Sequence, residues 1–123
     1  MEMSKVAVWF EIPVTDMARA KQFYSYVTQS TFRDEDMPGM KMSMFDGSET
    51  DTCGMLIEAE DYEPSATGQV IYFGADDLTT ILDRAIERGS KVLVPKTNIG
   101  DDKGYFAQFL DSEGNRIGLY SMN

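Results

Sequence analysis

The sequence VAVWFEIPVTDM, Val6 to Met17, indicates the fold, because its pattern returns later in the chain as VIYFGADDL, Val70 to Leu78. Each stretch starts with β-branched and aromatic residues typical of a buried strand and ends with polar residues that can start a helix. Placing Asp16 over Asp77 gives one constant offset of 61 residues, at which the strands around each helix fall into register. The pattern therefore indicates an internal duplication with two copies of one unit.

Hydrophobic periodicity predicts a strand, a helix and further strands in each copy. Thr15 and Asp76 are the expected N-caps of the two helices, and Gly89 is expected to end the second helix in a left-handed conformation. Pro95 is expected to close the strand that follows, because proline cannot donate a hydrogen bond to a sheet. The predicted strands are residues 6–14, 40–45, 53–58, 70–75, 91–94, 105–110 and 116–121.

The length of 123 residues fits one α+β domain, 1–123, made of two tandem βαββ modules. The modules are expected at about 1–61 and about 68–123, on either side of a linker that contains Pro64 and Gly68. One such unit leaves the apolar face of its sheet uncovered. We therefore expect the two units to join edge to edge, or to be swapped between chains.

The sequence is acidic, with 21 acidic residues, 11 basic residues and a formal charge of −10. This charge argues against nucleic acid and anionic membranes as partners and attracts cationic ligands, although acidity also simply keeps a protein in solution. No run approaches the roughly 18 apolar residues of a membrane span, and the start of the chain lacks a signal-peptide pattern. Cys53 is the only cysteine, which excludes an intrachain disulfide. We expect a cytoplasmic protein.

Four stretches of the chain resemble the vicinal oxygen chelate superfamily of glyoxalases, bleomycin resistance proteins and extradiol dioxygenases, namely VWFEIPVTDMARAKQFY (8–24), IYFGADDL (71–78), RGSKVLVP (88–95) and AQFLDSEGNRIGLYS (107–121). The resemblance implies a curved, cup-shaped mixed sheet with the helices on the outside, and it implies a homodimer. This fold hosts lyases, isomerases, epimerases, dioxygenases, antibiotic-inactivating enzymes and non-catalytic drug-binding proteins. The fold alone therefore does not assign an activity.

The resemblance also implies where a metal would bind, since enzymes of the family hold a divalent metal with His, Glu or Gln. Those positions here are Trp9, Met55 or its neighbour Gly54, Val70 and Gly118. None of these side chains offers the donors that a hard divalent cation requires, and the chain contains no histidine. We therefore predict no metal site and no cofactor at these positions, with a divalent metal at a non-standard site as the alternative.

Glu11 is the one acidic residue expected inside the cup, because strand alternation points Trp9 and Glu11 to the same face. It is the candidate catalytic residue, as a proton acceptor, and the candidate counter-charge for a cationic ligand. The alternative is a structural carboxylate that accepts hydrogen bonds from the backbone or from Tyr72.

The same alternation predicts a cup lined mostly by methionine and aromatic side chains, which suits an adaptable apolar pocket but also a collapsed core. The candidate ligand-binding residues are Trp9, Glu11, Met42, Met44, Met55, Tyr72, Phe106, Gln108 and Tyr120, with Leu110 and Arg116 on the same face. The opposite face, under the helices, is expected to hold Phe10, Ile12, Phe73, Phe109, Ile117 and Leu119.

Three functions stay open on this basis, and the sequence does not decide whether the protein is an enzyme. The first is a protein that binds a small hydrophobic or cationic molecule in the cup, completed in a homodimer, without a conventional metal centre. The second is a glyoxalase-related lyase or isomerase with a non-standard site that uses Glu11. The third is a non-catalytic dimeric interaction domain, its cup filled by its own Met and Phe side chains.

Overall fold

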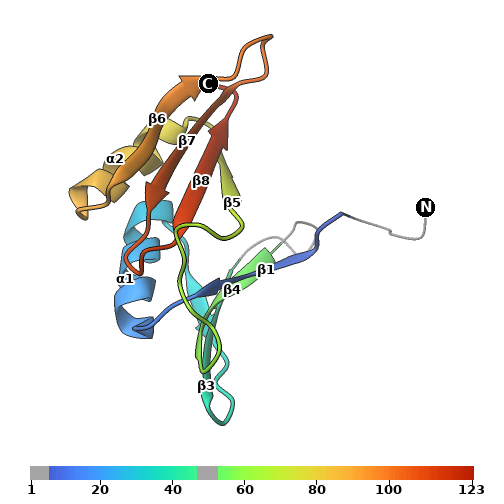
Figure 1. The fold of residues 1–123 in the computed structure, drawn as a ribbon, viewed down its shortest axis with the longest axis vertical. Helices are drawn as coiled ribbons and strands as arrows, with labels where there is room; N and C mark the ends of the chain where they lie inside the picture. The colour runs from blue at the N-terminus through green and yellow to red at the C-terminus, as the bar shows by residue number, and fades with distance from the viewer. Residues whose placement is uncertain (1–5, 47–52) are drawn as a thin grey trace.

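The computed structural model describes residues 6–46 and 53–123. Within these ranges the chain forms two helices and eight strands, arranged as two mixed four-stranded sheets (Figure 1), which confirms the predicted α+β class with two βαββ modules. The helices are α1 (Met17–Thr28) and α2 (Leu78–Glu87). The strands are β1 (Trp9–Pro13), β2 (Phe32–Asp34), β3 (Met40–Phe45), β4 (Cys53–Ala59), β5 (Ile71–Ala75), β6 (Val92–Asn98), β7 (Tyr105–Leu110) and β8 (Arg116–Ser121).

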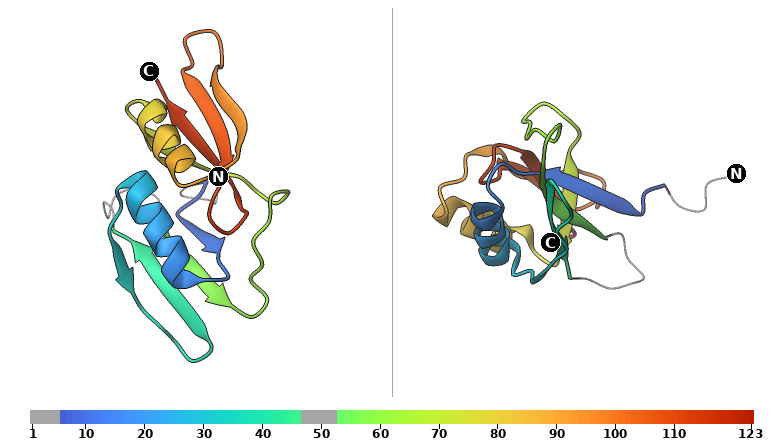
Figure 2. Two further views of the ribbon diagram at one scale, coloured as in Figure 1. Left: turned by 90° about the vertical axis from the view of Figure 1, so that its left-hand side faces the viewer. Right: turned by 90° about the horizontal axis from the view of Figure 1, so that it is seen from below.

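Each sheet pairs its first strand in parallel with its last strand, and the sheets stay open. The strand order is β1-β4-β3-β2 in the first sheet and β5-β8-β7-β6 in the second, so β1 and β5 are both edge strands. Figure 2 (left) shows both helices on the same side of the molecule, each in front of its own sheet. Neither α1 nor α2 covers the other face of its sheet. Neither helix of the described residues is long and apolar enough to cross a membrane.

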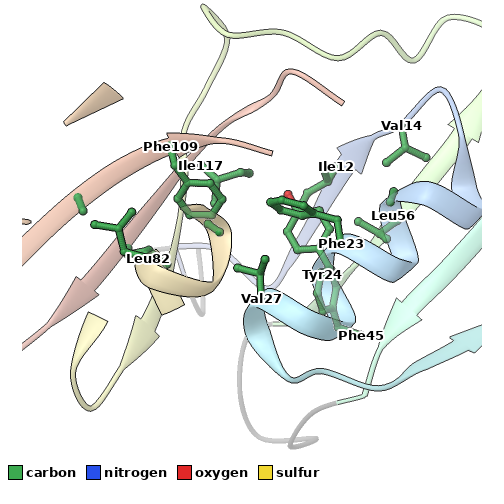
Figure 3. Close-up of a cluster of buried hydrophobic side chains, with 14 of the residues drawn as sticks. Ile12, Val14, Phe23, Tyr24, Val27, Phe45, Leu56, Leu82, Phe109 and Ile117 are labelled. Atoms are coloured by element: carbon green, nitrogen blue, oxygen red, sulfur yellow. The ribbon is translucent and has the colours of Figure 1, made fainter. Parts of the chain in front are cut away.

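The hydrophobic core lies between the sheets and the helices and is shared by both halves of the chain (Figure 3). Tyr24 and Val27 of α1 and Phe109 of β7 are fully buried in it. Phe10 of β1 and Phe73 of β5 meet edge to face with their ring centroids 5.8 Å apart, so the core joins the two first strands. The residues predicted under the helices all belong to this core or pack against it, which confirms the strand alternation: Phe10, Ile12, Phe73, Phe109, Ile117 and Leu119.

The turn at 111–115, between β7 and β8, fixes the second half of the chain to the start of α1. The Glu113 carboxylate accepts hydrogen bonds from the backbone N–H groups of Thr15 and Asp16, at 2.8 and 3.0 Å. Arg19 Nε donates to the other carboxylate oxygen at 2.7 Å. These charge-assisted bonds tie the turn at 111–115 to the N-terminus of α1, almost 100 residues earlier in the chain. The Glu113 charge is favourable there, because the N-terminus of a helix attracts negative charge.

Asp111 and Tyr24 form a second, buried contact beside this turn. The Tyr24 hydroxyl donates to Asp111 Oδ2 at 2.6 Å, and Asn115 donates from its side-chain nitrogen to the same oxygen and to the Pro13 carbonyl. Burial raises the pKa of the Asp111 carboxyl. Burial, together with the Asp111 charge, also raises the pKa of Tyr24 well above its usual value.

The two helix N-caps are Asp16 and Asp77, so the predicted caps Thr15 and Asp76 were each wrong by one residue. The side chain of Asp16 accepts from the backbone N–H of Arg19, and the side chain of Asp77 accepts from that of Thr79. The Thr15 N–H and hydroxyl donate instead to Glu113. Gly89 adopts φ +87°, which confirms the predicted left-handed end of α2.

The predicted strands also differ from the structure in three places. Pro95 does not end its strand as predicted. β6 continues to Asn98, with register shifts on both sides of Val94. This is possible since β6 is an edge strand, in which the missing proline N–H leaves no partner unpaired. The three-residue strand β2 was not predicted, since a strand so short carries little periodicity. β1 starts at Trp9 rather than Val6.

Candidate functional site

The faces of the two sheets that carry no helix hold the predicted site residues. On β1, Trp9 and Glu11 alternate with the core residues, and both are exposed. On the second sheet, Tyr72 is 46% exposed and Tyr120 37% exposed. The strand register places Phe106 opposite Tyr120 in the ladder between β7 and β8, on this same face. The two sheets therefore present separate open faces, each bounded by the edge strand that starts its module.

Methionines cover the open face of the first sheet. Met44 of β3 lies directly opposite Met55 of β4, and Met42 lies opposite Ile57 in the same ladder. Met42 and Met55 are buried, at 8% and 5% exposure, whereas Met44 is partly exposed. Tyr62 packs against this cluster from the segment that follows β4. Met42, Met55 and Ile57 therefore form a small buried hydrophobic cluster, and the partly exposed Met44 packs against it.

A cavity of about 580 Å³ lies beside β1, against the segment that links the two modules. Trp9 and Glu11 line it from β1, and Tyr62, Glu63 and Gln69 line it from the linking segment. Both charged side chains in its wall are carboxylates, and aromatic rings stand next to them. Carboxylates next to aromatic rings have the chemistry that can contact an organic cation or a planar apolar group.

Glu11 has a different partner from the one considered above. Its carboxylate accepts a hydrogen bond from the Tyr62 hydroxyl at 3.3 Å, not from Tyr72. The negative charge of Glu11, followed by this hydrogen bond, raises the pKa of Tyr62. Tyr62 and Glu63 were missed because residues 61–69 read as a polar linker. The aromatic ring between acidic neighbours was the only signal that could have identified them.

Tyr72 lies across Gly118 on the open face of the second sheet. Gly118 of β8 is the register partner of both Tyr72 on β5 and Gln108 on β7. A Cβ atom at Gly118 would overlap the Tyr72 ring. The Tyr72 hydroxyl oxygen accepts a hydrogen bond from Gln108 Nε2 at 2.6 Å, and Gln108 Oε1 accepts one from Arg116 at 2.7 Å. The glycine therefore allows side chains from three strands to join in one network.

The positions implied for metal ligands hold side chains that do not fit a divalent cation. Met55 lies on the open face next to Glu11 in the ladder, whereas Gly54 lies on the core face, where Phe10 covers it. Val70 precedes β5 and Gly118 lies under the Tyr72 ring. Among residues 6–46 and 53–123, no three His, Cys, Asp or Glu side chains are grouped so that they could hold a metal ion.

A family model described as the Glyoxalase/Bleomycin resistance protein/Dioxygenase superfamily matches residues 7–119. The chain belongs to this superfamily. A glyoxylase-like domain-containing protein from Didymella fabae is 31% identical to it over 110 residues, which is 85% of this chain and 84% of that protein. CFP32 from Mycobacterium bovis is 24% identical over 94% of this chain. The chain spans about half the length of CFP32, since the match covers 45% of it.

Solved structures of the superfamily have the same fold. TnmS3, an antibiotic binding protein from Streptomyces sp. CB03234, superposes with a TM-score of 0.75 at 27% identity, over 98% of each chain. A glyoxalase/bleomycin resistance protein from the same strain gives 0.73 at 27% identity, over 94% of this chain and 99% of that one. Glyoxalase I from Zea mays gives 0.69 at 18% identity over 94% of this chain and 45% of its own, a likeness in fold alone.

Proposed function

We propose that this member of the glyoxalase/bleomycin resistance superfamily binds a small hydrophobic or cationic molecule on the open faces of its sheets. We propose further that it does so without a divalent metal at the positions that the family's enzymes use. The observation that carries the proposal is the Tyr72 ring over Gly118. The aromatic ring of Tyr72 fills the space in which a metal-dependent relative would carry a glutamate side chain.

The cavity beside β1 supports a ligand of this class. Its volume of about 580 Å³ lies within the roughly 300–1,000 Å³ typical of small-molecule sites. Trp9 and Tyr62 supply aromatic faces, and Glu11 and Glu63 supply negative charge, with no basic residue among the described residues of the same wall. Met44 is partly exposed in the same register row as Glu11 and Met55, and it adds an adaptable apolar side chain to this face. The similarity to TnmS3, an antibiotic binding protein, agrees with a binding function.

A homodimer is part of this proposal, because the open faces are bounded by exposed apolar edge strands. Val8 and Trp9 at β1 are 61% and 45% exposed, and Tyr72 on β5 is 46% exposed. A second copy placed against these edges would remove the apolar side chains from water and enclose a ligand between two open faces. An interaction domain without a ligand would use the same surface.

A second candidate is a lyase or isomerase in which Glu11 acts as the base, with a divalent metal held at a non-standard site. Its support is the place of Glu11 in the cavity wall, where the carboxylate accepts a 3.3 Å hydrogen bond from the Tyr62 hydroxyl. Metal analysis separates the two candidates. Stoichiometric Mn, Ni, Zn or Fe that survives dialysis would favour the enzyme and overturn binding without a metal.

The direct test is a thermal-shift screen of the purified protein against cationic and aromatic compounds. We expect stabilisation by several degrees for at least one compound, as mass action predicts for a ligand of the folded state. Glu11→Gln should reduce the shift produced by cationic hits. Asp83→Asn removes one negative charge from exposed α2 and should not reduce it. Absence of any hit would overturn the binding function in favour of the interaction domain.

A further inference from the structure

The open face of the second sheet carries a row of three residues on adjacent strands, Tyr72 on β5, Gly118 on β8 and Gln108 on β7. Tyr72 and Gln108 are two strands apart, a separation of about 10 Å at the usual strand spacing. The Tyr72 ring crosses the intervening strand only because Gly118 has no side chain. A long exposed side chain is thereby held flat at a defined place on the face.

Arg116 fixes the direction of the hydrogen bonds in this row. A guanidinium group only donates, so the Gln108 atom that lies 2.7 Å from Arg116 Nη1 must be the amide oxygen. The amide nitrogen then faces Tyr72 and donates to its hydroxyl oxygen at 2.6 Å. Arg116 Nε donates to the Ala66 carbonyl at 2.9 Å, which holds the guanidinium in place.

The Tyr72 hydroxyl therefore accepts from Gln108 and keeps its own proton for another partner. No acceptor for that proton lies within hydrogen-bond distance in the part of the chain that the structure describes. Since Tyr72 is 46% exposed on the open face, the proton is available to a molecule bound there. The hydrogen bond from Arg116 polarises the Gln108 amide, and the bond from Gln108 polarises the Tyr72 hydroxyl. Tyr72 is therefore a stronger donor.

We propose that the Tyr72 hydroxyl donates a hydrogen bond to a carbonyl oxygen of the ligand, and that Gln108 and Arg116 are positioning residues for this donor. The proposal rests on the proposed function, since it requires a ligand on the open face. A neutral carbonyl group on an apolar body fits the site best. The charge of −10 disfavours an anionic oxygen, and the aromatic rings of Phe106 and Tyr120 on the same face suit an apolar body.

Two probes of the same shape test this contact, 2-acetylnaphthalene and 2-isopropenylnaphthalene, which differ only in a C=O or a C=CH₂ group. Their Kd values are measured by isothermal titration calorimetry on the full chain. We expect the wild-type protein to bind the ketone about five- to tenfold more tightly, the gain expected from about one net hydrogen bond.

Two variants remove the donor in different ways. Tyr72→Phe keeps the ring over Gly118, so the preference for the ketone should disappear while the Kd of the alkene stays unchanged. Gln108→Glu offers a carboxylate that accepts from both Arg116 and Tyr72, which turns the Tyr72 proton inward and should also abolish the preference. Gln22→Glu makes the same change on exposed α1 and should leave the preference intact.

Infrared spectroscopy of the bound ketone separates a direct contact from a structural effect. The carbonyl band should lie at lower frequency in the wild-type complex than in the Tyr72→Phe complex. Equal Kd values for the two probes, or a preference that survives Tyr72→Phe, would overturn this inference and leave the proposed function standing. Failure of both probes, together with an empty thermal-shift screen, would overturn the proposed function and this inference with it.

Discussion

Gly118 illustrates how one missing side chain changes the chemistry of a site. The resemblance to metal-dependent relatives implies a glutamate at this position, and here the Tyr72 ring occupies the space that a side chain would need. The same glycine lets Tyr72 reach Gln108 across β8. Gly118 therefore offers no side chain to a metal and gives the Tyr72 ring room to reach Gln108.

Gly118→Ala tests this packing. The added Cβ would overlap the Tyr72 ring, so we expect the ring to be displaced and the free energy of unfolding to fall by about 1–3 kcal/mol, as in other overpacked sites. Urea unfolding measures the change. Gly74→Ala is the matched control on β5, because its added Cβ meets no atom within 4 Å and should stabilise by about 0.5–1 kcal/mol. Equal effects of the two substitutions would contradict the account.

The turn at 111–115 is the element that couples the two halves, and its carboxyl groups respond to pH in opposite directions. Burial raises the pKa of Glu113, but the hydrogen bonds from Arg19, Thr15 and Asp16 outweigh it and lower that pKa to about 2. The stability that Glu113 contributes is therefore present above its unfolded pKa of 4.5 and is lost as the pH falls toward 2.

Asp111 in the same turn has the opposite sign. Burial raises its pKa, so the folded protein binds the Asp111 proton more tightly than the unfolded chain. The contribution of Asp111 to the free energy of unfolding therefore declines as the pH rises from its unfolded pKa of 3.8 through its folded pKa. Glu113 alone accounts for a loss of stability in acid at this turn.

Glu113→Gln should destabilise the protein by about 1–3 kcal/mol at pH 6, because charge-assisted hydrogen bonds to α1 are lost. The difference from wild type should shrink at pH 3, since the wild-type protein has by then lost part of the Glu113 contribution. Urea unfolding at both pH values measures this, with Asp83→Asn as the charge-matched control. If the difference in free energy of unfolding between wild type and Glu113→Gln is as large at pH 3 as at pH 6, Glu113 does not contribute stability in this pH-dependent way.

At the scale of elements, the sequence predicted most of the fold because the duplication repeats its signals. The two true N-caps, Asp16 and Asp77, preserve the predicted offset of 61 residues, although each cap lies one residue later than expected. The predicted end of a strand at Pro95 was wrong, because a proline ends a strand inside a sheet but can be accommodated at an edge. Periodicity does not reveal which strands lie at an edge. Strand alternation separated the open face from the core correctly.

The site itself was less predictable. Trp9 and Glu11 were placed on the open face from alternation alone, whereas Tyr62 approaches them from a linker without periodicity. The row of Tyr72, Gly118 and Gln108 joins three strands that are far apart in sequence, so its hydrogen bonds depend on register and on a close approach at glycine. Neither the strand register nor the close approach at Gly118 can be predicted from the sequence.

For the whole molecule, the exposed edges of β1 and β5 predict self-association. Light scattering on a size-exclusion column should give twice the chain mass of 13.8 kDa. Val8→Glu places a charge on the 61% exposed side chain at the β1 edge and should shift the protein to monomer. Ile86→Glu makes a comparable change at a 49% exposed position on α2 and should not. A wild-type monomer at all accessible concentrations would rule out the dimer.

We propose that side chains on the open faces bind the ligand directly, without a divalent metal at the positions that the resemblance implies. The most direct measurement is a crystal structure of the protein with the strongest hit of the thermal-shift screen, recorded with anomalous scattering at metal absorption edges. We predict density for the compound against Glu11 and Tyr62, or against Tyr72, without a metal peak between the two halves. A coordinated metal ion at Gly118 or Met55, or a compound bound only on the helix side, would contradict the account.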